Sequence, residues 1–300
     1  MAGPVVEVRG LVKRYGDVVA VDDVDLNVET GDVYGYLGPN GAGKTTSLRM
    51  MLGLIRPTAG SVRIFGRDPQ LSVRALDGVA GFVEEPRFYP YLTGRKNLEL
   101  LAAFDGDGAA SRIDEVLDVV ELADRAGDRV GGYSHGMKQR LGIAAALLRA
   151  PRLLLLDEPT TGLDPGGMRD MRLLIRRLAE DGITVLLSSH QLAEVEEVCN
   201  RVAIIRRGRI AFEGTLADMR GRTATLYRLR TTDPDRALEI CAAQAGIADA
   251  RLDGGREIVF TAEQDAVAAL SVALIDTGVA ITALVPQAPT LEELFFRFTE

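Results

Sequence analysis

Hydrophobic and polar residues alternate along two segments near the start of the chain, residues 5–12 (VVEVRGLV) and 18–28 (VVAVDDVDLNV). This period of two is typical of β-strands that bury one face and expose the other to solvent, as the strands of antiparallel sheets commonly do. The pattern therefore predicts that the fold begins with an antiparallel sheet.

Three later segments are apolar without alternation: residues 32–38 (DVYGYLG), 152–159 (RLLLLDEP) and 182–190 (GITVLLSSH). A helix is predicted between the last two, because four apolar residues recur there at helical spacing: Met168, Met171, Ile175 and Leu178. Strands that are buried on both faces and joined by helices are typical of parallel sheets. These segments predict an α/β core built on a parallel sheet.

Between residues 86 and 140 the pattern changes to a helical one. Thr93 is placed to cap one helix, and Ser111 with Asp114 resembles the capping box at the start of another. We therefore expect a helical subdomain at about residues 86–140, inserted between the strands of the core.

The last third of the chain has a different element order. A hairpin at residues 201–214, turning at Arg207-Gly208, is expected to close a first domain of residues 1–220. For residues 221–300 the pattern predicts strands at 223–230, 247–252, 257–261 and 279–285 and helices at 234–244, 264–276 and 290–298. The order βαββαβ with a final helix predicts a small accessory α+β domain of the ferredoxin-like type.

Composition and charge narrow the class of protein. Of the 300 residues, 47% are hydrophobic and 26% charged, and no run reaches the ~18–20 apolar residues of a membrane-spanning helix. The first residues have no apolar region of the kind found in signal peptides, so we expect a cytoplasmic protein without disulfides, with Cys199 and Cys241 as buried thiols. A net charge of −8 argues against nucleic acid as a partner.

The segment GPNGAGKT, from Gly38 to Thr45, fits the pattern G-x-x-x-x-G-K-[ST] between a predicted strand and a predicted helix. Glycines let successive backbone N–H groups surround phosphate oxygens, and the start of a helix adds its partial positive charge. Lys44 would meet the β- and γ-phosphates, and the Thr45 hydroxyl would bind Mg²⁺. A glycine-rich turn with a surface lysine is the disfavoured alternative.

Two carboxylates, Asp157 and Glu158, stand at the end of the apolar run LLLLDEP. A carboxylate at the end of a buried strand beside a phosphate loop can hold Mg²⁺ through water, which is the role we expect for Asp157. Glu158 can then polarise the water that attacks the phosphate. The alternative is a pair of solvated acids at a strand terminus.

The segment YSHGMKQR raises the question of whether Ser134 and His135 form a nucleophile and its base. Adjacent residues at the start of a helix do not face each other, so they are poorly placed to share a proton. A serine hydroxyl, a nearby glycine and a helix N-terminus instead favour an anion site, and a simply capped helix is the open alternative.

These motifs, in this order, resemble the nucleotide-binding subunit of ABC transporters over residues 5 to about 220. The resemblance implies that YSHGM corresponds to the family's signature segment, usually LSGGQ, which binds the γ-phosphate of ATP held by the other subunit. Ser134 and Gly136 match that pattern, whereas His135 and Met137 depart from it. The implied fold is a P-loop ATPase core with a parallel sheet, an antiparallel β subdomain and a helical subdomain.

The resemblance also carries roles to single residues. His190, after the strand ITVLLSS, matches the histidine that touches the γ-phosphate and orients the water and Glu158; Lys44 and Glu158 complete the expected catalytic set. The residues implied to bind ATP are Tyr15 (stacked on adenine), Gly38, Asn40, Gly41, Ala42, Gly43, Lys44, Thr45, Thr46, Ser134, Gly136 and Asp164. Without the resemblance, Tyr15 would be read as a packed tyrosine, His190 as an ordinary polar residue and Asp164 as a helix cap.

One position departs from the family in a way that matters chemically. Where the family commonly has glutamine, the segment GFVEEP places Glu84, followed by Glu85. A carboxylate would repel the γ-phosphate unless Mg²⁺ lay between them. Our hypothesis is that Glu84 is a conditional metal ligand, beside Thr45 and Asp157, and that residues 85–91 form the surface that couples to a partner.

The motifs and the resemblance together imply an ATPase that uses ATP and Mg²⁺ and pairs head to tail with a second copy of itself. A separate integral membrane permease would supply the pore and place the protein at the cytoplasmic face of the membrane. The accessory domain and the ending PTLEELFFRFTE resemble subunits of drug and antibiotic exporters. Two alternatives are a non-transport ABC-type ATPase acting on nucleic acid or the ribosome, and a module that binds ATP without turnover.

Overall fold

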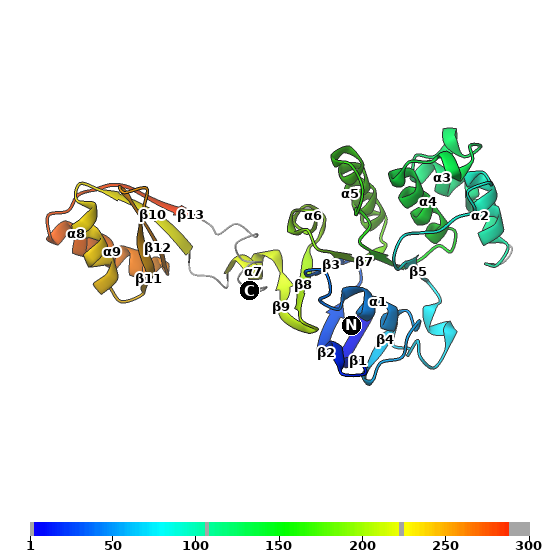
Figure 1. Ribbon diagram of the computed structural model, residues 1–300, viewed down its shortest axis with the longest axis horizontal. Coiled ribbons are helices and arrows are strands. Elements are labelled where there is room, and N and C mark those ends of the chain that lie inside the picture. Colours follow the sequence, from blue (N-terminus) through cyan, green and yellow to red (C-terminus); the bar gives the residue numbers. More distant parts are fainter. Residues whose placement is uncertain (1–2, 106–107, 222–224, 288–300) are drawn as a thin grey trace. The chain divides into compact units, whose positions relative to one another are not determined.

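The computed structural model describes residues 3–105, 108–221 and 225–287 (Figure 1). The chain divides into two compact units, the first extending to Leu216 and the second beginning at Ala217.

The strands of the first unit are β1 (Val6–Tyr15), β2 (Val18–Val28), β3 (Val33–Leu37), β4 (Ala59–Ile64), β5 (Val79–Phe82), β6 (Leu153–Asp157), β7 (Thr184–Ser189), β8 (Arg201–Arg206) and β9 (Arg209–Thr215). The helices are α1 (Lys44–Met51), α2 (Gly94–Ala102), α3 (Ile113–Val119), α4 (His135–Leu147), α5 (Pro165–Glu180), α6 (Leu192–Val198) and α7 (Leu216–Gly221), the last crossing the division between the units. Short 3₁₀ helices occur at Val73–Leu76, Ala110–Arg112, Ala123–Arg125 and Val130–Gly132.

A six-stranded sheet in the order β5-β6-β7-β3-β8-β9 forms the centre of the first unit. All its neighbouring strands are parallel except the pair β8–β9, which is the predicted hairpin. Every residue of β3, β6 and β7 is buried, which explains why these strands are continuously apolar in the sequence. Because β6, β7 and β3 are adjacent and parallel, the segments that follow them leave the sheet at the same edge.

The predicted antiparallel sheet is confirmed, with the order β2-β1-β4. Its inner residues join one hydrophobic core with side chains of β3 and α1, such as Tyr34 and Leu48. Strand β4 was missing from the sequence prediction. Only Val62 and Ile64 of its six residues are buried, so its apolar pattern is too short to be recognised.

The helical subdomain is formed by α2, α3 and α4. Thr93 caps α2 by accepting a hydrogen bond from the backbone of Lys96, as predicted. The capping box at Ser111 was wrong: the Ser111 hydroxyl donates to the carbonyl of Gly108, and α3 begins two residues later at Ile113. Residues 110–112 form a 3₁₀ turn instead, in which the serine bonds backwards along the chain.

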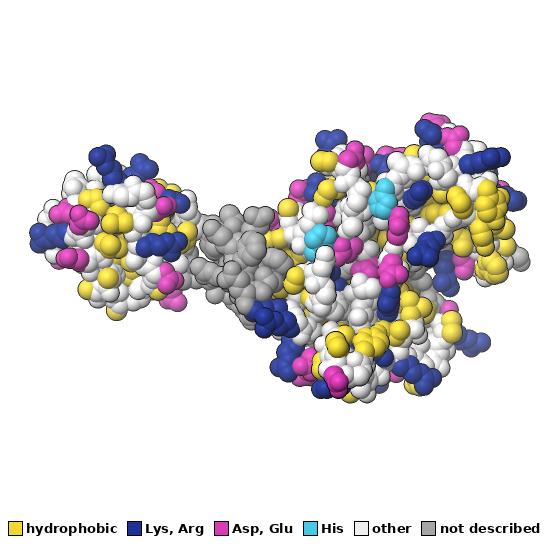
Figure 2. All heavy atoms as spheres, in the orientation of Figure 1, with side chains coloured by type: hydrophobic (Ala, Val, Ile, Leu, Met, Phe, Trp, Pro, Cys, Tyr) yellow, Lys and Arg dark blue, Asp and Glu magenta, His cyan; other side chains and the backbone are white. Residues whose placement is uncertain are grey.

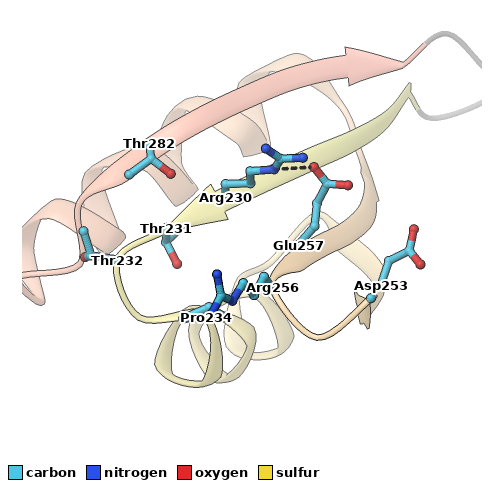
Figure 3. A pocket seen from close by; sticks show the side chains of 9 residues that line it. Arg230, Thr231, Thr232, Pro234, Asp253, Arg256, Glu257 and Thr282 are labelled. Atoms are coloured by element: carbon cyan, nitrogen blue, oxygen red, sulfur yellow. Dashed lines mark hydrogen bonds and ion pairs between the residues drawn. The ribbon is translucent and has the colours of Figure 1, made fainter.

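The second unit contains β10 (Thr225–Thr231), α8 (Pro234–Ala243), β11 (Ile247–Asp253), β12 (Glu257–Ala262), α9 (Gln264–Asp276) and β13 (Ile281–Gln287). Its antiparallel sheet has the order β11-β12-β10-β13, and residues of α8 and α9 share a core with one face of it. At one end of this sheet, Arg230 and Arg256 project into a polar hollow of about 760 Å³, where Arg230 pairs with Glu257 (Figure 3). The helix predicted at 290–298 lies outside the described residues.

Both cysteines are buried free thiols, as expected. Burial raises the pKa of Cys241 to about 11, so this thiol is protonated at neutral pH. Within the described part of the chain, no helix has the length and apolar character needed to cross a membrane.

The edge pairing of β5 with β6 gives a test of the fold. Gly81 lies opposite Leu155, and a Cβ atom at Gly81 would stand 1.8 Å from the Leu155 carbonyl oxygen. We therefore expect Gly81→Ala to lower the free energy of unfolding by at least about 2 kcal/mol in urea titrations. Gly127→Ala is the matched control, because nothing lies within 4 Å of a Cβ there; equal midpoints for the two variants would contradict the observed pairing.

Candidate active site

The glycine-rich segment 38–43 connects β3 to α1 and requires glycine at two of its positions. Gly43 precedes the first turn of α1 with a φ of +109°, and a Cβ there would lie 2.5 Å from the Ala20 carbonyl oxygen. At Gly38 a Cβ would lie 2.4 Å from the carbonyl oxygen of Ile205. At Gly38 and Gly43 the backbone therefore passes too close to its neighbours for any side chain, and the loop ends at the start of a helix, a position that favours anions.

Lys44 is folded back into this loop and is only 5% exposed. Its ammonium group donates hydrogen bonds to the carbonyls of Gly38 (2.7 Å) and Pro39 (3.3 Å). It also lies 3.2 Å from a carboxylate oxygen of Glu158. The ammonium group is thus held by two carbonyls of the loop, and Glu158 is its anionic partner.

Asp157, the last residue of β6, is buried, and each of its carboxylate oxygens accepts a hydrogen bond from a hydroxyl group. Its Oδ2 accepts a hydrogen bond from Thr45 Oγ1 at 2.9 Å, and its Oδ1 accepts one from Ser188 Oγ at 2.5 Å. Carboxylate and hydroxyl oxygens are ligands that Mg²⁺ prefers. Among the described residues no cluster of three or more His, Cys, Asp or Glu could hold a metal by itself, so a cation here would take its other ligands from water or substrate.

Glu158 follows Asp157 with its backbone in the left-handed region, at a φ of +48°. Its N–H donates to Ser188 Oγ (3.0 Å), and its Oε2 accepts a hydrogen bond from Thr161 Oγ1 (2.7 Å). The same oxygen lies 2.8 Å from Nδ1 of His190. The turn at Glu158 is what brings two consecutive carboxylates into one cluster with Lys44 and His190.

The electrostatic surroundings keep Glu158 ionised. Burial acts to raise the pKa of its carboxyl group, but the Thr161 hydrogen bond, the charge and hydrogen bond of Lys44 and the charge of His190 together lower it below its ordinary value. Glu158 is therefore a carboxylate at neutral pH, and the attraction of Lys44 is one of the main reasons.

Ser134 and His135 point to different partners. Ser134 caps α4 by accepting a hydrogen bond from the Met137 N–H at 3.2 Å. His135 instead contacts the Thr161 carbonyl oxygen through Nε2 (2.9 Å) and a Glu85 carboxylate oxygen through Nδ1 (3.1 Å). The two side chains therefore do not form a nucleophile and base.

A hollow of about 590 Å³ lies beside the start of α4, and the residues that line it include Ser134, Gly136, Gly162, Asp164 and Gly167. Asp164 caps α5 by accepting a hydrogen bond from the Gly167 N–H at 2.9 Å. Neither Lys44 nor Glu158 lines this hollow. The structure thus shows two distinct polar sites. One is the Lys44 cluster, formed by Lys44, Thr45, Asp157, Glu158 and His190. The other is the Ser134 hollow just described.

The remaining predicted residues lie at the rim of the loop or away from it. Tyr15 is 49% exposed, and the Lys13 ammonium lies 4.9 Å above its ring. Asn40 and Gly41 are exposed, Ala42 is buried and Thr46 is half-buried on α1.

Glu84 also has a left-handed backbone (φ +70°), and its carboxylate pairs with Arg49, one turn along α1 from Thr45.

Sequence reasoning missed two hydroxyl residues that orient the carboxylates, Ser188 and Thr161. Ser188 bonds to Asp157 and to the backbone of Glu158, and Thr161 bonds to the Glu158 side chain. The available signal was the polar ending of an otherwise apolar strand, LLSSH, and the TT pair that follows Pro159.

With this geometry established, comparisons with known proteins identify the family. Residues 21–161 match the sequence model of the family described as ABC transporter. The chain is 38% identical to the bacitracin transport ATP-binding protein BcrA of Bacillus licheniformis, over 98% of this chain and 96% of that protein. The chain belongs to the ABC transporter family. The protein is thus an ABC ATPase, the subunit that binds ATP and whose general activity is ATP hydrolysis.

Two further similarities extend the comparison. The daunorubicin resistance ATP-binding protein DrrA3 of Streptomyces coeruleorubidus is 36% identical over all of this chain and 97% of its own length. A dimeric post-hydrolysis structure of the ATP-binding cassette MJ0796, bound to ADP and Pi, superposes with a TM-score of 0.63 and 28% identity, over 70% of this chain and 98% of that one. The ABC cassette fold is thereby confirmed.

The lowered pKa of Glu158 can be tested by measuring the free energy of unfolding at two pH values. A carboxyl group whose pKa is lowered by folding stabilises the folded state above its unfolded pKa, and the contribution is lost as the pH falls through the folded pKa. We expect wild type to exceed Glu158→Gln in unfolding free energy at pH 7 and the difference to shrink below about pH 4.3. Urea titrations at both pH values measure it; a difference that grows on acidification would contradict the assignment.

Proposed function

We propose that Mg²⁺-bound ATP occupies the Lys44 cluster and that Glu158 activates the water that hydrolyses it. The observation that carries this proposal is the convergence of the phosphate loop, Asp157 and Glu158, with Lys44 only 3.2 Å from Glu158 and Thr45 bonded to Asp157. A cation, a metal-binding pair of oxygens and a carboxylate base in one cluster are the parts that phosphoryl transfer to water requires.

Each residue has a separate task in this proposal. The N–H groups of the loop, with Asn40, Gly41, Ala42 and Thr46, surround the phosphates, and Lys44 neutralises charge on the β- and γ-phosphates. Thr45 and Asp157 hold Mg²⁺, which when bound offsets the charge that develops on the phosphate oxygens. His190 holds the Glu158 carboxylate in place and reaches toward the γ-phosphate, and Tyr15 stacks on adenine.

Binding of ATP changes the environment of Glu158. The triphosphate competes with the Glu158 carboxylate for the Lys44 ammonium, because both are anions that need the same cation. When Lys44 turns to the phosphates, one of the causes that lower the pKa of Glu158 is weakened. Glu158 is then a stronger base in the ATP-bound state, where a base is required.

The second half of each site is proposed to come from a second copy of the chain. Ser134 and Gly136 lie at the start of α4, where a serine hydroxyl and a helix N-terminus favour a phosphate, and they line an open hollow of about 590 Å³. Asp164 lines the same hollow. A head-to-tail dimer would place the γ-phosphate held by one Lys44 loop in the Ser134 hollow of the other copy, and the dimeric form of the similar cassette supports this arrangement.

A separate membrane permease is the proposed partner of this dimer. An apolar groove of about 420 Å³, whose lining includes Phe82, Phe88, Leu101 and Phe104, lies between α2, α4 and the end of β5. Figure 2 shows hydrophobic side chains gathered over the part of the surface near α2, where Phe104 is 88% exposed. Because residues 86–88 line this groove, we propose residues 85–91 as the coupling surface, at the cytoplasmic face of the membrane.

The transported substrate is proposed from the relatives alone. BcrA is named for bacitracin transport and DrrA3 for daunorubicin resistance, and both match this chain along nearly its whole length. We propose export of a drug, antibiotic or lipid-like molecule. A non-transport ATPase acting on nucleic acid or the ribosome is not favoured, since full-length relatives are transport and resistance proteins and the net charge is −8.

Glu158→Gln separates binding from turnover. Loss of the general base should reduce phosphate release at least about 100-fold, while ATP binding persists and the ATP-bound dimer accumulates in light scattering. Ser134→Ala is the companion variant and should weaken dimer formation. A lone protomer that hydrolyses ATP at the full rate, with Ser134→Ala unimpaired, would contradict the proposal.

Glu84 can be tested as a metal ligand. The Arg49–Glu84 pair lies one helical turn from Thr45, so release of Glu84 from Arg49 would leave a carboxylate free to approach bound Mg²⁺. Glu84→Ala should raise the Mg²⁺ concentration that gives half-maximal ATPase activity by roughly tenfold. An unchanged rate together with an unchanged Mg²⁺ dependence would show that Glu84 is not a ligand; Glu99→Ala, an exposed acid on α2, is the control.

A further inference from the structure

His135 occupies a position where the family's signature segment usually has glycine, and its imidazole ring bridges two segments. Nε2 lies 2.9 Å from the carbonyl oxygen of Thr161, and Nδ1 lies 3.1 Å from a carboxylate oxygen of Glu85. Gly162 lies against the ring, since a Cβ there would stand 3.1 Å from Nε2. The ring therefore fits between the segment after β5 and the turn after Glu158.

Both partners of the ring can only accept hydrogen bonds. A carbonyl oxygen and an ionised carboxylate have no proton to donate, so both contacts are hydrogen bonds only when both ring nitrogens carry protons. A neutral imidazole can satisfy one of the two partners but not both. The bridge is thus complete in the imidazolium form and half-made in the neutral form.

The contacts continue from His135 to the proposed base. Thr161, whose carbonyl receives the His135 contact, donates its own hydroxyl hydrogen bond to Glu158 at 2.7 Å. On the other side, Glu85 is the first residue of the proposed coupling surface. One short run of contacts therefore joins the permease-facing segment to Glu158: Glu85, His135, Thr161, Glu158.

We propose that His135 is a positioning residue. Through its contact with Thr161, a movement of residues 85–91 would change how the Glu158 carboxylate is held. The proposal rests on the proposed function, in which Glu158 activates water. Displacement of Glu85 by a permease would move or release the imidazole, and Thr161 would then hold Glu158 differently.

The other charged groups near His135 are engaged elsewhere. Those that line the Ser134 hollow are Glu121, Arg125, Arg140, Asp164 and Asp170. Arg140 pairs with Glu121 and Asp170, Arg125 pairs with Asp128, and Asp164 caps α5. Glu85 is the carboxylate in contact with the imidazole, so its removal tests the bridge directly.

The test compares the ATPase kinetics of purified full-length wild type, His135→Ala, His135→Gln, Glu85→Gln and the double variant His135→Ala/Glu85→Gln. We expect each single variant to lower kcat about fivefold, with KM for ATP changed less than about twofold, and the double variant to be no slower than His135→Ala.

Glu115→Gln is the matched control, since it also replaces a carboxylate that pairs with a nearby side chain on the surface of the helical subdomain; it should leave kcat unchanged. Full activity of Glu85→Gln, or additive losses in the double variant, would overturn the proposal. A rise in KM without a fall in kcat would also overturn it, because it would assign His135 to nucleotide binding alone. If Glu158→Gln stayed active, the proposed function would fail instead.

Imidazole NMR provides a readout that does not depend on activity. The chain has two histidines, so the ring signals of His135 and His190 can be assigned with a single His190→Gln variant. We expect Glu85→Gln to change the NMR chemical shifts of the ring nitrogens of His135 and to leave those of His190 unchanged. Unchanged His135 signals would show that the Glu85 contact is not formed in solution, which would overturn the bridge.

Discussion

The buried charge of Lys44 is the constraint on which the rest of the site depends. An ammonium group withdrawn from water is strongly unfavourable unless anions or dipoles surround it. The loop carbonyls of Gly38 and Pro39 and the carboxylate of Glu158 meet that need. The proposed binding of ATP is thus an exchange of one anion for another around a fixed cation, and the strength of the Lys44–Glu158 pair opposes nucleotide affinity.

Sheet topology explains why this cation and the carboxylates meet at all. Strands β6, β7 and β3 are adjacent and parallel, so the residues after Leu37, Asp157 and Ser189 emerge at one edge although they are distant in sequence. Full burial of these strands fixes their register, because a slip would carry polar residues into the core. The hydrophobic core thereby sets the distances between the groups proposed to perform chemistry.

Much of this arrangement could be predicted from the sequence, because several residues of the site lie within short stretches whose own pattern marks their place in the fold. The segment 38–45 carries its glycine pattern in one stretch, and the apolar run before Asp157 marks a strand end. Contacts between residues distant in sequence could not be predicted. These are the pair of Arg49 with Glu84 and the contacts of His135 with Thr161 and Glu85. At Ser111 two local bonding modes compete, and the backward bond to Gly108 prevails over the cap.

The backbone of Glu158 shows how the site maintains an unfavourable conformation. A left-handed φ at a residue with a side chain costs about 1–3 kcal/mol unless its surroundings compensate, and here the backbone N–H bonds to Ser188 while the carboxylate meets Thr161, His190 and Lys44. Two of these partners change in the proposed cycle: Lys44 when ATP binds, and Thr161 through His135. A carboxylate held by several moderate contacts could therefore respond to nucleotide on one side and to the proposed membrane partner on the other, which a single rigid contact would not allow.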